Sequence, residues 1–376
     1  TFNGTGYNIS QSNGIINQTT GALNCNNFTQ TGGTYNITGN GTINIANNFS
    51  QTGGTVSITA SPTFNITNDF SQTGGSFTAN SSNINIGNDF TLSGAYTFNA
   101  NTSTISVSGN VSISGATFNC GTGTIVMTGA ANKTLSSNQN LYNLTINSTA
   151  TKTLSTNITQ SAGGVLTITN GTLDLNGNTL TLGANFTQSA GTLIIGSGTF
   201  NGGSAYNVTI NTGATVNQTT GTLNCNNFTQ TGGSFLVTSG NINITNDFTL
   251  SGAYTFNANT STISVSGNVS ISGATFNCGT GTIVMTGAAN KTLSSNQNLY
   301  NLTINSTATK TLSTNITQSA GGVLTITNGT LDLNSFQFNS GADLNLSSGT
   351  GTLTIGGGTF NGTGYNISQS NGIINQ

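Results

Sequence analysis

The stretch FSQTGGTVSITASPTFNITND, residues 49–69, decides the fold. Apolar and polar residues alternate in three short runs, 49–52, 55–59 and 63–67, and a period of two is typical of β-strands that bury one face. The first two runs are separated by two glycines, which allow a corner with positive φ, and the next two by a corner that contains Pro62. The stretch therefore predicts one turn of a coil that has three strands and three corners.

Copies of this stretch follow one another along the chain. Successive copies begin at Phe28, Phe49, Phe70 and Phe90, which are 20 or 21 residues apart. A period of this length is typical of solenoids. Three later intervals, from Val111 to Leu135, from Leu135 to Ile158 and from Ile158 to Phe186, are longer than these. We expect an all-β parallel β-helix (β-solenoid) whose triangular rungs have about 20–28 residues and three short strands each.

Larger repeats contain these small ones. Residues 88–176 recur unchanged as 246–334, and the first eighteen residues recur as the last eighteen, 359–376. We expect a single continuous solenoid over 1–376, with tandem halves 1–198 and 199–358, and with 359–376 starting the next period of a longer array. Sixteen rungs per period, at about 4.8 Å each, predict an axial rise of about 77 Å.

The composition disfavours several functions. Charged residues make up 3% of the chain, and His, Glu, Arg and Trp are absent. Most enzymes need a general acid or base, a metal shell or an oxyanion clamp, so we expect no enzyme and no cofactor. A net charge of −2 also disfavours nucleic acid, whose binding relies on many contacts from Lys and Arg to phosphates. No apolar run approaches the roughly 20 residues of a membrane helix, so we expect no membrane insertion in this segment.

Two columns of inward side chains are expected to hold the rungs together. Phe28, Phe49, Phe70 and Phe90 form the first, at the rung starts. The second lies two residues further on and contains Gln30, Gln51 and Gln72, but Leu92 and Ile113 in later rungs. Because glutamine alternates there with apolar residues, we predict that these three amides point inward and bond one another in a ladder, as stacked amides do in cross-β structures.

Asp69 and Asp89 are the weak candidates for a metal site. They occupy the same corner of consecutive rungs, about 5 Å apart, and carboxylate oxygens are calcium ligands. The alternative is that they cap the corner and are interchangeable with asparagine. The copied rungs carry Asn227 and Asp247 there, which breaks the acidic pair and favours capping.

Cysteines and asparagines offer two further interpretations. Cys25, Cys120, Cys225 and Cys278 form no CxxC pair, and we read them as small buried apolar residues with free thiols. Many Asn-x-Ser/Thr triplets occur on the expected outer faces, so glycosylation is geometrically open.

Residues 167–183, TITNGTLDLNGNTLTLG, resemble repeats of very large secreted bacterial surface proteins. The chain is similar, over nearly its whole length, to filamentous haemagglutinin-like adhesins and autotransporter passenger domains. The resemblance implies a right-handed parallel β-helix, export, and a role in adhesion, biofilm or cell-surface fibres. The secretion domain and receptor-binding modules of that family are not in this sequence.

The leading hypothesis is a structural extracellular fibre or adhesin stalk, secreted or on the cell surface. Its expected partner is itself, through axial continuation and lateral bundling of fibres, and surface glycans are a further possibility. The alternative is a ligand-binding solenoid with a glycan-binding or ice-binding face. Outward threonine pairs such as Thr63 and Thr67 motivate the ice-binding reading, but the faces mix Ser, Asn and Thr.

Overall fold

The computed structural model describes residues 1–94, 96–115, 117–273, 275–346 and 350–376. Across these residues the regular structure consists of short β-strands with no helix, which confirms the all-β prediction. Contacts divide the chain into two compact units, residues 1–184 and 185–376. Each unit is a β-solenoid, and the two together contain about 18 turns with about three strands per turn.

The rung quoted first forms as the alternation predicts. Its strands are β8 (Phe49–Gln51), β9 (Thr55–Ile58) and β10 (Thr63–Ile66). In β9 and β10 every second residue is buried, because the pleat sends alternate side chains to opposite faces. The corner between β8 and β9 depends on Gly54, whose φ is +76° and whose Cβ, if present, would lie 2.6 Å from the carbonyl oxygen of Gly33. A side chain is therefore excluded at this corner.

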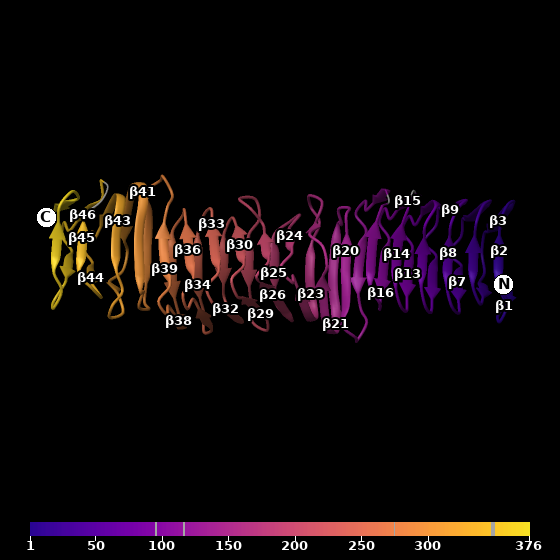
Figure 1. The fold of residues 1–376 in the computed structure, drawn as a ribbon, viewed down its shortest axis with the longest axis horizontal. Coiled ribbons are helices and arrows are strands. Elements are labelled where there is room, and N and C mark those ends of the chain that lie inside the picture. The colour runs from indigo at the N-terminus through magenta and orange to yellow at the C-terminus, as the bar shows by residue number, and fades with distance from the viewer. Residues whose placement is uncertain (95, 116, 274, 347–349) are drawn as a thin grey trace. The chain divides into compact units, whose positions relative to one another are not determined.

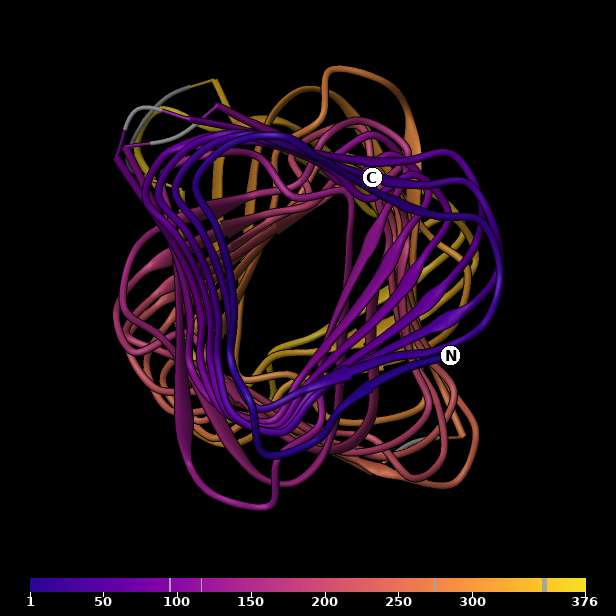
Figure 2. The same ribbon diagram turned by 90° about the vertical axis from the view of Figure 1, so that its right-hand side faces the viewer.

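Successive rungs pair in parallel and in register (Figure 1). β8 pairs with β11 (Phe70–Gln72), and β10 pairs with β13 (Asn83–Ile86), so that Phe70 lies on Phe49 and Ile84 on Phe64. This confirms the parallel stacking expected from the short repeat. Viewed from the end in Figure 2, the indigo turns of the first unit lie over one another.

Stacked aromatic rings fill the interior of the first unit. The ring centroids of Phe28 and Phe49 are 5.5 Å apart, and those of Phe49 and Phe70 are 4.8 Å apart. Phe90 continues the column at 5.2 Å from Phe70, with its ring tilted by 50°. All four side chains are fully buried, and aromatic pairs at these distances add to the stability that burial supplies.

The second unit repeats this interior. Phe228 and Phe248 begin β31 (Phe228–Gln230) and β34 (Phe248–Ser251) and lie 5.6 Å apart. A second column stacks Phe256 on Phe235 at 5.1 Å. In both units, therefore, phenylalanine rings pack on phenylalanine rings of the neighbouring rungs.

The predicted register is wrong for the two intervals that begin at Leu135 and Ile158. Leu135 pairs with Leu154 and not with Ile158, because β20 (Lys133–Ser137) lies along the far end of β21 (Asn143–Leu154). Ile158 pairs with Leu180 and not with Phe186. Each of these residues therefore meets an earlier residue of the next turn than the sequence pattern indicated, and both rungs are shorter than expected.

The reason for this error is the length of two strands. β21 spans 12 residues and its neighbour β23 (Leu166–Asp174) spans 9, so the chain runs straight on where the sequence pattern suggested a corner. Both strands recur in the second unit as β41 (Asn301–Leu312) and β43 (Leu324–Asp332). Within the described residues, the structure contains no helix of the length and apolarity needed to cross a membrane.

Candidate functional site

The predicted glutamine column lies in the core of the first unit. Gln30, Gln51 and Gln72 are each fully buried. The Gln30 side-chain amide donates to Gln11 Oε1 at 3.1 Å, and the Gln51 amide donates to Gln30 Oε1 at 2.9 Å. We call Gln11, Gln30 and Gln51 the glutamine ladder.

Gln72 lies outside this ladder, which corrects one predicted bond. Its amide donates to the backbone oxygen of Thr97 at 3.3 Å, and Gln51 Oε1 and Gln72 Oε1 have no hydrogen-bond partner. The next residue in the column is Leu92, so the amide series ends at the rung where an apolar side chain follows. In the second unit Gln230 lies between Ile210 and Leu250 and donates only to backbone oxygens.

A second ladder runs along one outer corner of the first unit. At each step the side-chain oxygen of one corner residue accepts a hydrogen bond from the backbone N–H of the corner residue one rung further on. The distances are 3.1 Å for the first three steps and 2.7 Å for the fourth. The corner ladder consists of Asn27, Asn48, Asp69, Asp89 and Asn110.

The two acidic residues take part in this ladder. Asp69 Oδ1 accepts from the backbone N–H of Asp89 and, at 2.7 Å, from the side chain of Asn88. Asp89 Oδ1 accepts from both the backbone and the side chain of Asn110. Through these bonds Asp69 and Asp89 cap the corner. Among the described residues, no three Asp, Cys, Glu or His side chains form a group that could hold a metal ion.

The same corner ladder recurs in the second unit. Asn185, Asn207, Asn227 and Asp247 each accept from the backbone N–H of the next corner residue, at 2.7–3.2 Å. An aspartate and an asparagine therefore perform the same task at equivalent positions. The feature that they share is an oxygen acceptor two bonds from Cβ, and the negative charge is not required for it.

Two lysines are buried in a way that the sequence reading missed. Lys152 and Lys310 have no exposed surface. Lys152 Nζ donates to the backbone oxygens of Gly129 at 2.5 Å and Ala131 at 2.7 Å, so it binds the corner of the preceding rung. Desolvation by burial, followed by the nearby charge of Lys133, lowers the pKa of Lys152. Lys310 repeats this arrangement with Gly287 and Ala289.

The cysteines separate into two kinds. Cys25 and Cys225 are buried, and Cys120 and Cys278 are half-buried; all four are free thiols. Burial raises the pKa of Cys25 to about 11 and that of Cys225 further. A thiol with a raised pKa is a poor nucleophile at neutral pH, so Cys25 and Cys225 are core residues in chemical terms.

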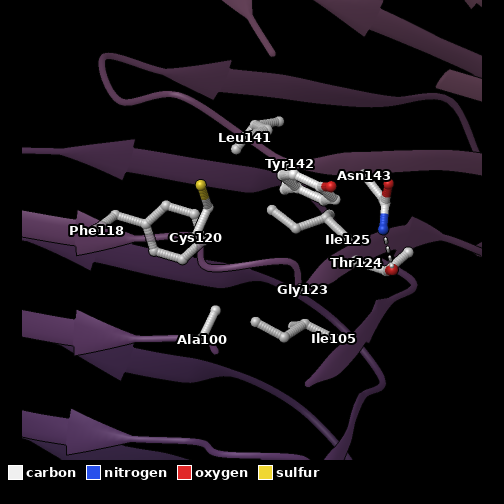
Figure 3. A pocket seen from close by; sticks show the side chains of 10 residues that line it. All are labelled: Ala100, Ile105, Phe118, Cys120, Gly123, Thr124, Ile125, Leu141, Tyr142 and Asn143. Carbon is white, nitrogen blue, oxygen red and sulfur yellow. Dashed lines mark hydrogen bonds between the residues drawn. The ribbon is translucent and has the colours of Figure 1, made fainter. Parts of the chain in front are cut away.

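Cys120 lines a small cavity, shown in Figure 3. The cavity has a volume of about 10 Å³, and Phe118, Ile125 and Leu141 supply much of its wall. The second unit holds an equal cavity around Cys278. A volume of this size holds at most one water molecule, so neither cavity accommodates a substrate.

No protein-family model, curated protein or solved structure matches the chain. In both ladders and at the two buried lysines, polar side chains bond from one rung to the next. The arrangement is therefore one that joins turn to turn along an axis.

Proposed function

We propose that this chain is a structural segment of an extracellular fibre or adhesin stalk, similar in design to filamentous haemagglutinin-like and autotransporter-type surface proteins. The observation that carries the proposal is the corner ladder, which repeats the same bond over several consecutive rungs in each unit. A bond of this kind adds one identical joint per turn, and a stack of such turns extends by repetition.

The surface composition supports the same proposal. The four lysines and six aspartates are spread over 376 residues, so the sides of the solenoid carry little electrostatic repulsion. Outer positions are filled by Asn, Ser and Thr, which hold water without charge. We infer that such fibres associate along the axis and bundle laterally with copies of themselves.

Immunogold electron microscopy of the producing cells tests this function. An antibody raised against the 376-residue chain is expected to label fibres outside the cell envelope, and deletion of the gene is expected to remove them and to reduce surface attachment. Labelling confined to the cell interior, or fibres that persist unlabelled after deletion, would contradict the proposal.

A further inference from the structure

One face of the first unit carries an open groove that is uncharged and whose lining mixes polar and apolar atoms. Its volume is about 480 Å³, and it is lined by Asn65, Asn85, Ser106, Thr67, Gly87, Ser108 and Thr128, together with Ile66 and Ile86. We call it the uncharged groove. These residues come from four successive rungs, so at about 4.8 Å per rung the groove extends about 14 Å along the axis.

The outward column of the groove is held in place by neighbouring rungs. Asn85 pairs with Asn65 on one side and with Ser106 on the other. The Asn85 amide donates to Asn65 Oδ1 at 2.9 Å, and the Asn65 amide donates to Asn44 Oδ1 at 2.9 Å. The side chains that line the groove are therefore oriented before any ligand arrives, which reduces the entropy lost on binding.

Several polar atoms of the groove have unused hydrogen-bonding capacity. Asn85 Oδ1 and the hydroxyls of Thr67 and Ser106 make no side-chain hydrogen bond to the described residues. Ser108 and Thr128 bond each other at 3.2 Å. The free atoms are one amide acceptor and two hydroxyls, and a hydroxyl both donates and accepts.

This set of atoms selects a class of ligand. No charged residue lines the groove, so neither an anion nor a cation finds an opposite charge there. An apolar ligand would cover the hydroxyls without replacing their hydrogen bonds to water, which is unfavourable. A neutral ligand that has both hydroxyls and apolar C–H faces satisfies the donors and acceptors and also covers the apolar atoms of the lining. We propose that the uncharged groove binds a neutral oligosaccharide that lies along the solenoid axis.

Gly87 lines the groove and has no side chain. It lies at a corner where an added Cβ would meet the backbone oxygen of Thr67 at 2.0 Å. The equivalent residue of the second unit is Thr245, whose hydroxyl bonds Cys225 O at 3.4 Å. The second unit thus carries a threonine side chain at the same corner, and the proposal assigns the site to the first unit.

The test uses the full chain and three tetrasaccharides as probes: cellotetraose, maltotetraose and chitotetraose. Saturation-transfer NMR is expected to show binding of at least one of them with a Kd on the order of 1 mM, because the groove is open and its ligand competes with water. Ser106→Val is expected to weaken binding about fivefold or more, by removing one free hydroxyl. Valine is tolerated in this outward column, since Val126 pairs with Ser106.

Ser264→Val is the matched control. Residues 246–334 copy 88–176, so this change has the same structural cost in the second unit and is expected to leave binding unchanged. The proposal is overturned if no tetrasaccharide binds, if the anionic tetragalacturonate binds better than the neutral probes, or if Ser264→Val weakens binding as much as Ser106→Val. Thermal hysteresis of an ice suspension without saccharide binding would also overturn it and would assign the face to ice. Fibre formation is scored separately by electron microscopy, so a failure here is distinguishable from a failure of the structural role.

Discussion

At the scale of single residues, this protein uses polar side chains as joints between rungs. Asp69 shows the principle, because its carboxylate oxygen accepts from the backbone of Asp89 and from the side chain of Asn88. Asparagine does the same work one rung earlier and at most corners of the second unit. The structure therefore contains the hydrogen bonds that the predicted capping role requires.

Substitution of Asp69 separates capping from metal binding. We expect Asp69→Ala to lower the unfolding free energy by about 1 kcal/mol, because the Asp89 N–H loses its acceptor at a partly buried corner. Asp69→Asn is expected to be nearly neutral, since it keeps an oxygen acceptor. Urea unfolding with and without calcium measures both. A calcium-dependent loss in Asp69→Asn would contradict the capping role.

The lowered pKa of Lys152 predicts how the stability of the fold changes with pH. Below the folded-state pKa the ammonium is charged in both states, and its desolvation penalty is constant. As the pH rises from that value toward 10.5, the value of an unburied lysine, the unfolded state binds more protons, and stability rises.

The measurement compares the wild type with the double variant Lys152→Met/Lys310→Met in urea at a series of alkaline pH values. As the pH rises, the unfolding free energy of the wild type is expected to increase relative to that of the double variant. Because tyrosines and thiols titrate equally in both proteins, they cancel in this difference. If the unfolding free energies of the two proteins changed in parallel with pH, the pKa of Lys152 would not be lowered.

At the scale of strands and rungs, the alternation of residues was sufficient to predict most of the fold. The runs 49–52, 55–59 and 63–67 contain β8, β9 and β10 to within one residue at each end. Prediction failed near Ile158, which was read as the start of a rung. The side-chain oxygen of the preceding residue, Asn157, does accept a hydrogen bond from the next rung, from the backbone N–H of Thr179, but the extended β21 places Leu154 and not Ile158 on Leu135.

Two features of the interior were not fully predicted, the first because it depends on contacts between rungs and the second because a charge hid its pattern. Gln51 and Gln72 have the same local sequence, Phe-Ser-Gln-Thr, and only the neighbouring rungs decide whether the amide finds a partner. Lys152 alternates in phase with Leu154, which places it inward. That period-two phase was the available signal, and the positive charge masked it.

The glutamine ladder gives a ranked stability prediction. Gln51→Leu removes the donor to Gln30 Oε1 and to Ser76 O, so we expect a loss of about 1–2 kcal/mol in unfolding free energy. Gln72→Leu is expected to cost less, because Gln72 donates only to the backbone oxygen of Thr97, no other glutamine depends on it, and its neighbour is Leu92. Urea unfolding of the two variants measures the order. Equal costs would mean that the bond to Gln30 contributes nothing.

At the scale of the whole molecule, the proposal is a fibre held together without metal and with little charge. We expect purified fibres to keep their length in EDTA and in molar salt, because hydrogen bonds and buried apolar surface join the rungs. Negative-stain electron microscopy after each treatment measures this. Disassembly in EDTA would refute the metal-free account.

Denaturing gels of the same fibres test covalent continuity. The repeated eighteen residues favour a long tandem chain, which is expected to migrate far above the 37.9 kDa of this segment. A single band near that mass would show that fibres consist of separate stacked subunits.

The central claim is that each layer of the fibre is one turn of a single folded chain. Cryo-electron microscopy of the fibres tests it most directly. The account predicts layers about 4.8 Å apart in which consecutive layers hold different residues, with Asp69 above Asn48 and Phe70 above Phe49. Layers formed by separate chains, each with the same residue stacked on itself as in an amyloid fibril, would contradict it.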